Sequence, residues 1–145
     1  MKLVKRLEND FKNIIAIKDS SGNIYNKCEL KRLKIFPGTE LKLLSGLKEF
    51  GCSGIISAVA NVTSKISSKI FRDWQTGKNP VQENNRLISI RKCFDQYNLI
   101  SGVHTVLSEN DKDFLNLVPP LQILDKKNKI KLFSELEKLN FKTAA

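Results

Sequence analysis

The 145-residue sequence has little of the chemistry from which most metal and redox sites are built. It holds one histidine, His104, and three widely spaced cysteines, Cys28, Cys52 and Cys93, with no Cys-x-x-Cys pair. A lone histidine has no second histidine with which to share a zinc ion, so we expect no metal site. An odd number of scattered cysteines favours reduced, buried thiols over disulfides or catalytic nucleophiles.

Long apolar runs are also missing. No stretch approaches the roughly 20 apolar residues that cross a bilayer. The first six residues lead into Leu7-Glu8-Asn9-Asp10 instead of the apolar core of a signal peptide. With 41% hydrophobic and 28% charged residues, the composition is that of a globular protein. We therefore expect a cytoplasmic protein that has no membrane partner.

Acidic residues are fewer than basic ones, and the resulting net charge of +10 suggests nucleic acid as a possible partner. The excess is nearly all lysine, however, and it is scattered along the chain with only five arginines. The densest run, over 125–131, fits the solvated face of a helix, and no basic and aromatic residues interleave as base stacking requires. The sequence therefore predicts no nucleic-acid function. Binding through charge alone, which would weaken steeply with salt, is the alternative.

The most informative stretch is the short apolar run over 14–17, which delivers Lys18 into the polar turn 19–22. Its length, its isoleucines and its flanking turn residues predict a buried strand. A strand that is apolar on both faces is typical of a parallel sheet covered by helices, where chemistry gathers at the carboxyl ends of the strands. Partial burial there would lower the pKa of a lysine and free its amine to form a Schiff base with a carbonyl. The alternative is a strand-end lysine whose stem simply reaches water.

Repeating helix and strand units surround this strand. Leu3, Leu7 and Phe11 recur at a spacing of four and predict an amphipathic helix over 2–11. After Lys18 we expect alternating elements: a short helix over 23–33, a strand over 33–36, a helix over 41–50 ended by Gly51, and a third buried strand over 54–61.

The remaining sequence predicts only helices. Thr63 or Ser64 is expected to cap the first, which ends at the turn 77–80, and Pro119-Pro120 precedes the last. The others are expected over about 81–97, 102–109 and 126–139. Apolar residues at helical spacing are the expected core of this part, namely Ile66, Ile70, Phe71, Trp74, Leu87, Ile90, Phe94, Ile130, Phe133 and Leu136.

Four ordered motifs, over 11–22, 36–40, 51–62 and 119–121, together resemble the dihydrodipicolinate synthase and N-acetylneuraminate lyase family. The resemblance covers essentially the whole chain. It implies an α/β fold, the C-terminal part of a TIM (β/α)8 barrel with a helical extension, commonly assembled as a tetramer. It also implies a class I lyase or aldolase that forms a Schiff base with pyruvate or another 2-keto acid and needs no cofactor.

The resemblance assigns roles to particular residues. Lys18 matches the lysine that condenses with the keto group. Ser20, Gly38, Glu40 and Ser57 are the implied substrate-binding residues; the last three match positions that line the pocket in the members acting on sugar acids. The loop over 37–40 looks closer to the members that handle 2-keto-3-deoxy sugar acids than to the lysine-biosynthetic synthases.

The chain is shorter than the roughly 250 residues of a complete barrel. The resemblance implies that 1–77 holds the last three strands and 78–145 the C-terminal helical region. A full member would place five strands before Met1, with a hydroxyl and glycine motif for the pyruvate carboxylate and a proton-moving tyrosine; Tyr25 and Tyr97 lie in the wrong contexts for that role. We expect an enzyme that needs its N-terminal half, or that forms a homo-oligomer. The alternative is a non-catalytic remnant or interaction fragment.

Overall fold

The computed structural model describes residues 2–24 and 30–142. The chain separates into two compact units, Met1–Ser57 and Ala58–Ala145. The first unit contains the sheet, and the second is helical. None of the helices in the described ranges is long and apolar enough to span a membrane.

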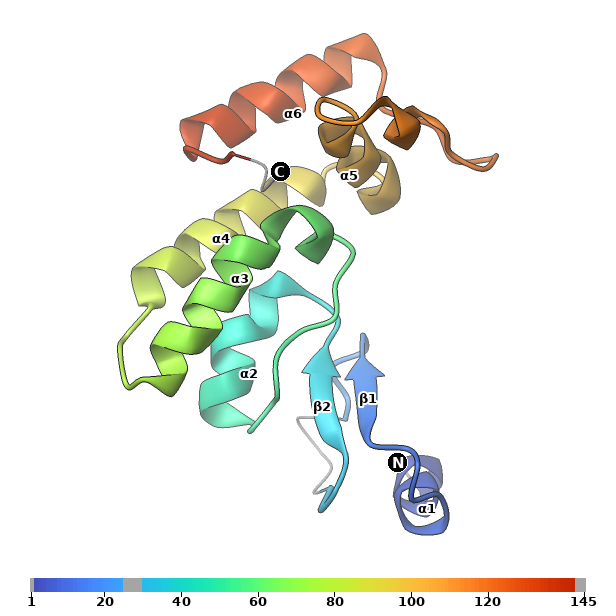
Figure 1. Cartoon of the computed structure of the whole chain (residues 1–145), viewed down its shortest axis with the longest axis vertical. Coiled ribbons are helices and arrows are strands. Elements are labelled where there is room, and N and C mark those ends of the chain that lie inside the picture. Colours follow the sequence, from blue (N-terminus) through green and yellow to red (C-terminus); the bar gives the residue numbers. More distant parts are fainter. Residues whose placement is uncertain (1, 25–29, 143–145) are drawn as a thin grey trace. The chain divides into compact units, whose positions relative to one another are not determined.

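The first unit is an α/β segment with a small parallel sheet (Figure 1). Helix α1 (Lys2–Asp10) precedes strand β1 (Ala16–Asp19), which pairs in parallel with β2 (Lys34–Pro37). The 3-10 turn η1 (Glu40–Lys42) and helix α2 (Leu43–Glu49) follow. The predicted helices over 2–11 and 41–50 and the strands near Lys18 and Ile35 are confirmed. The predicted helix over 23–33 falls largely on 25–29, outside the described residues, and 30–33 are not helical.

The predicted third strand, over 54–61, is wrong as a regular strand. The segment 53–57 runs along β2 and donates two backbone hydrogen bonds to it, from Ser53 to Ile35 (2.9 Å) and from Ile56 to Pro37 (3.0 Å). Three residue steps on this segment therefore match two on β2, as in a β-bulge. Gly54, at φ 141°, has a backbone conformation that other residues rarely adopt, and it lies inside this mismatch. The described sheet consequently has two strands, and the chain turns helical at Ala60.

Glu8 and Arg32 join α1 to the start of β2. The Glu8 carboxylate is buried and accepts hydrogen bonds from the backbone N–H groups of Arg32 (2.6 Å) and Leu33 (2.9 Å). The Arg32 guanidinium donates in return to four carbonyl oxygens around the end of α1, those of Glu8, Phe11, Lys12 and Ile14. Carbonyls at a helix end have no partner within the helix, so the arginine satisfies groups that would otherwise need water. The hydrogen bonds from Leu33 and Arg32 lower the pKa of Glu8.

The second unit is built from four longer helices and one 3-10 turn in its described part (Figure 1). They are α3 (Ala60–Gln75), α4 (Val81–Phe94), α5 (Leu99–Leu107), η2 (Lys112–Leu115) and α6 (Lys126–Lys138). Helices α3 and α4 pack against each other, α5 packs against both, and α6 packs against α4 and α5. The side chains of Asn98 and Asp125 cap α5 and α6 by accepting hydrogen bonds from their first backbone N–H groups.

Helix α3 begins earlier than expected. It starts at Ala60, and Thr63 lies inside the helix, where its hydroxyl donates to the carbonyl oxygen of Val59 (3.0 Å). The predicted capping role of Thr63 or Ser64 is therefore wrong. A threonine hydroxyl can bond the carbonyl four residues back as readily as it caps a helix, so its sequence position alone did not fix the boundary.

The core of the second unit lies where its helices meet. Its fully buried members include Ile90, Phe94, Val106 and Leu132. Leu87, Ile90, Phe94 and Ile70 were expected inside and are fully buried. Ile130 was also expected inside, but 61% of it is exposed, and Leu132 takes the buried position on α6. Leu136 is buried and Phe133 packs half-buried against the core, as expected, so of the three residues predicted to face inward on this helix only Ile130 is wrong.

Two of the three cysteines confirm the expectation of buried free thiols. Cys52 and Cys93 are buried and unpaired in disulfides, and burial raises the pKa of both. Cys28 lies outside the described residues. A raised thiol pKa keeps the reactive thiolate scarce near neutral pH, which agrees with a packing role for both side chains.

The difference in burial between Leu132 and Ile130 on α6 is directly testable. Replacing Leu132 by alanine removes a fully buried side chain, and we expect it to lower the free energy of unfolding by about 2–5 kcal/mol. Replacing the exposed Ile130 by alanine on the same helix is the matched control and should change stability by less than about 0.5 kcal/mol. Urea unfolding followed by circular dichroism measures both. Equal losses for the two variants would contradict the observed face.

The Glu8 contact predicts a pH dependence. Because the pKa of Glu8 is lowered in the folded protein, its stabilisation is present above the ordinary glutamate pKa and is lost as the pH falls through the lowered value. Replacing Glu8 by glutamine should therefore lower the free energy of unfolding near neutral pH. The difference in this free energy between the variant and the parent should become smaller as the pH drops toward about 3. Urea midpoints across that range test this. Glu49 is an exposed carboxylate of the same unit, and Glu49→Gln is the matched control. Its urea midpoints should equal those of the parent at every pH.

Candidate functional site

The predicted Schiff-base lysine lies in β1, one residue before the strand ends. Lys18 is opposite Phe36 of β2, and neighbours in register project to the same face of a parallel sheet. Lys18 is exposed, and Ile15 just before the strand is 69% exposed. The expectations of a buried strand and of a partly buried lysine are therefore wrong for this chain. The physical reason is that β1 has a paired strand on one edge only within the described residues.

Asp19 shapes the turn that follows Lys18. Its buried carboxylate accepts hydrogen bonds from the Ser21 backbone N–H (2.9 Å) and hydroxyl (2.7 Å), from the Gly22 N–H (3.0 Å) and from the Ile24 N–H (2.8 Å). A charged acceptor makes each of these bonds stronger than a neutral one would. The turn is thus fixed from inside by the residue adjacent to the lysine.

Ser20 and Gly38 meet where β1 and β2 end. The backbone N–H of Gly38 donates to the Asp19 carbonyl oxygen (3.0 Å), which continues the pairing of the two strands past the sheet. A Cβ atom at position 38 would lie 2.6 Å from the Ser20 hydroxyl oxygen and 3.1 Å from its Cα. Real Cβ contacts do not come so close, so only glycine fits there without displacement of the serine. The geometry brings together two of the residues that the sequence singled out.

Glu40 and Ser57 form a second pair in the same unit. The Ser57 hydroxyl donates a hydrogen bond of 2.7 Å to the Glu40 carboxylate, and Glu40 is completely buried. The side chain of Thr39 accepts from the Leu41 N–H (3.3 Å), and this caps the 3-10 turn on which Glu40 lies. A buried carboxylate needs such donors, because an unpaired charge in the interior is costly.

All five predicted site residues therefore come from the ends of β1, β2 and the neighbouring segment 53–57. Lys18 and Ser20 are exposed, whereas Gly38 and Ser57 are half-buried and Glu40 is buried. The residue that sequence reasoning missed is Asp19, which holds the turn without any assigned role. Its signal was present: an aspartate followed by two serines and a glycine is typical of a turn in which the carboxylate bonds backbone N–H groups two to three residues on.

The described residues contain no cluster of side chains that could hold a metal ion. Over 2–24 and 30–142, no three His, Cys, Asp or Glu side chains gather as metal ligands. His104 is in the second unit, where its Nδ1 lies 2.9 Å from the Phe114 carbonyl oxygen and its ring meets that of Phe114 edge to face. The histidine is thus accounted for by local packing.

The close approach of Gly38 and Ser20 gives a stability test. Replacing Gly38 by alanine should cost about 1–3 kcal/mol, because the new methyl group overlaps the Ser20 side chain. Adding Ser20→Gly removes the hydroxyl and the Cβ, although the Cα remains 3.1 Å away, so the double variant should recover part of the loss. Urea unfolding of the two single variants and the double variant measures the recovery. Strictly additive losses would show that the two positions do not meet.

Comparison with known proteins relates this chain to one enzyme family. The model of the Dihydrodipicolinate synthetase family matches residues 1–139. The 4-hydroxy-tetrahydrodipicolinate synthase of Desulforamulus reducens is 33% identical over 86 residues, which cover 56% of this chain and 29% of that protein.

Solved structures of similar fold are dihydrodipicolinate synthases and their relatives. One is the dihydrodipicolinate synthase of Bacillus anthracis, with a TM-score of 0.79 and 22% identity, covering 94% of this chain and 48% of that one. Another is a prophage protein of the dihydrodipicolinic acid synthase family from E. coli K12, solved in complex with pyruvate, with a TM-score of 0.80 and 20% identity, covering 97% and 51%.

The chain spans about half the length of these solved relatives. Their fold is a TIM barrel, in which parallel strands alternate with helices. This chain is likewise α/β and contains a small parallel sheet. The family model covers nearly the whole chain, residues 1–139 of 145. This chain therefore belongs to the dihydrodipicolinate synthetase family.

Proposed function

We propose that this chain supplies the Schiff-base lysine of a class I lyase or aldolase that acts on pyruvate or another 2-keto acid. The observation that carries the proposal is the position of Lys18, at the end of β1 beside the Asp19 turn, in a chain of this family. The pyruvate complex of the E. coli relative supports a small 2-keto acid as the substrate class.

The chemistry needs one amine and one electron sink. The neutral Nζ of Lys18 adds to the keto carbon, the resulting carbinolamine takes up a proton from solvent and loses water, and an iminium ion remains. Breaking the bond between the α and β carbons sends its electron pair toward the iminium nitrogen and leaves an enamine, while the β-hydroxyl gives its proton to solvent and becomes the carbonyl of the released aldehyde. In the reverse direction that enamine attacks an aldehyde, so the same lysine serves cleavage and condensation.

The neighbouring residues would hold the rest of the substrate. Ser20 is exposed beside Lys18 and offers a hydroxyl that can donate and accept. Gly38 leaves room next to it, and Ser57 presents a hydroxyl from the adjacent segment. Glu40 would act through Ser57, since its carboxylate is buried and accepts a hydrogen bond from the serine hydroxyl. The loop over 37–40, which resembles that of the members acting on 2-keto-3-deoxy sugar acids more than that of the lysine-biosynthetic synthases, favours such a sugar acid as the substrate.

The active unit would contain more than this chain alone provides. In the proposed arrangement, 1–77 corresponds to the last strands of the barrel and 78–145 to its helical region. An N-terminal half, or further copies of the chain in a homo-oligomer, would complete the substrate pocket. Exposed apolar side chains on α1 and before β1, those of Leu3, Phe11 and Ile15, support association with another polypeptide surface.

A second candidate function rests on the same exposed residues. A fragment with a free strand edge and exposed apolar groups can serve as an interaction module without any catalysis. In that case Lys18 would be dispensable. The two proposals differ in whether a covalent adduct forms at this one amine.

Borohydride trapping tests the catalytic proposal. The chain, co-expressed with the N-terminal half of a barrel of this family, is incubated with pyruvate and reduced. Hydride added to the iminium carbon leaves a stable secondary amine, so we expect a three-carbon adduct located on Lys18 by peptide mass spectrometry. Lys18→Ala should abolish the adduct completely.

Lys34 provides the matched control, since it is an exposed lysine at the start of the adjacent strand. Lys34→Ala should leave the adduct at Lys18 undiminished. An adduct at other lysines, or none in an assembly that forms, would instead support the interaction module. For that module, Lys18→Ala should preserve association with the N-terminal half.

A further inference from the structure

The second unit has a hollow lined by cationic side chains, well outside the residues assigned to Schiff-base chemistry. It has a volume of about 260 Å³ and lies between one face of α3, the first turns of α4 and the segment that follows α6. Its cationic side chains are Lys65 and Lys69 on α3, Arg86 on α4 and Lys142 near the end of the described chain. Glu83 supplies one carboxylate, so the lining has four positive groups against one negative.

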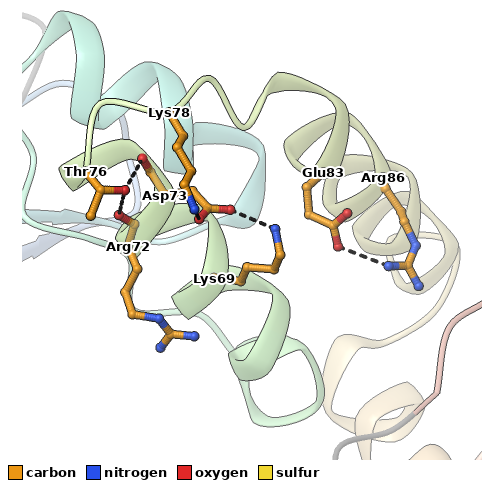
Figure 2. Close-up of polar contacts among 7 residues, drawn as sticks. All are labelled: Lys69, Arg72, Asp73, Thr76, Lys78, Glu83 and Arg86. Atoms are coloured by element: carbon orange, nitrogen blue, oxygen red, sulfur yellow. Dashed lines mark hydrogen bonds and ion pairs between the residues drawn. The ribbon is translucent and has the colours of Figure 1, made fainter.

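Two of these cations already have partners. Lys69 donates to Asp73 (2.7 Å), whose other oxygen lies 3.5 Å from Lys78, and Arg86 pairs with Glu83 (3.0 Å), as Figure 2 shows. Arg86 also donates to the carbonyl oxygens of Leu139 (2.9 Å) and Asn140 (2.6 Å) beyond α6. The Asp73 carboxylate raises the pKa of Lys69, so this ammonium group stays charged. These contacts hold one side of the hollow in place.

The other two cations are unpaired. Neither Lys65 nor Lys142 makes a hydrogen bond or ion pair with any residue in the described ranges, and both are exposed. Glu83, the carboxylate of the lining, is occupied by Arg86. The hollow thus presents two ammonium groups from separate parts of the unit, and no carboxylate among residues 2–24 and 30–142 pairs with either of them.

The floor of the hollow is apolar. Val62 is buried and Ile66 is half-buried, and both lie on the same face of α3 as Lys65 and Lys69. Positive charge beside a low-dielectric surface attracts an anion more strongly than the same charge in open water. An apolar floor also favours a ligand with a short hydrocarbon part over a fully hydrated inorganic ion.

We propose that the hollow between α3, α4 and the end of α6 binds a small dicarboxylate, with one carboxylate at Lys65, the other at Lys142, and the carbon chain over Val62 and Ile66. The site is independent of Lys18, since all its residues belong to the second unit. Each carboxylate of the ligand would form an ion pair with one of the two ammonium groups. A monocarboxylate of similar length could pair with only one of them.

Titration of the full 145-residue chain with succinate at constant ionic strength tests the site. Isotope-labelled protein is followed by amide chemical shifts, and we expect saturable changes on α3, α4 and the residues after α6. Butyrate and inorganic phosphate serve as comparison ligands and should each bind at least about threefold more weakly, since the first lacks one charge and the second lacks the apolar part.

Single substitutions assign the binding to these residues. Lys65→Ala and Lys142→Ala should each weaken succinate binding by about three- to tenfold, because each removes one charged contact. Lys127→Ala, an exposed lysine of α6 outside the hollow, has the same change in net charge and should bind succinate as the parent does. Both lysines are exposed, so unchanged helical circular dichroism is expected for every variant.

Three results would overturn the proposal. They are an absence of saturation by succinate, equal affinity for butyrate or phosphate, and an equal loss of affinity in the Lys127 variant. Each would reduce the hollow to a generally basic surface that attracts anions according to net charge and salt concentration.

Discussion

The carboxylate of Asp19 is the constraint on which the candidate site depends. Both of its oxygens are used on the turn after β1, and the same residue supplies the carbonyl oxygen that pairs with Gly38. One aspartate therefore fixes where Ser20 lies relative to the end of β2. Lys18 directly precedes Asp19, so these hydrogen bonds also hold the backbone of the lysine, although its side chain is exposed. Asp19 thus fixes the backbone next to Lys18 without any need to touch a substrate itself.

The short-range features of this site could be predicted from the sequence because local chemistry determines them. A run of isoleucines followed by Asp19 and two serines ends a strand in a turn in almost any context. The role of Gly38 as a pocket residue, in contrast, was implied only by the resemblance to a known family. What spacing could not reveal is that Ser20 and Gly38 approach so closely that a Cβ atom has no room, since such a contact depends on the register between two strands.

Features set by long-range packing could not be predicted in the same way. The isoleucine run predicts burial, yet Ile15 is largely exposed because burial of a strand requires neighbours on both edges and both faces. The third strand failed for a related reason: the bulge at Gly54 depends on how 53–57 meets β2, which no local pattern encodes. On α6, Leu132 and Ile130 are equally apolar, and only the position of the packed helices decides which is buried.

The two units differ in how completely their apolar side chains are buried. The first has a two-stranded described sheet and exposed apolar residues, so much of its folding free energy would have to come from a polypeptide that covers them. The second has a core in which Phe94, Ile90, Val106 and Leu132 are fully buried, so it has the packing that a unit of its size needs. The proposed ligand hollow lies wholly within this packed unit. The proposed Schiff-base residues lie in the first unit, so under the proposed function catalysis would depend more than the hollow does on any polypeptide that covers its exposed residues.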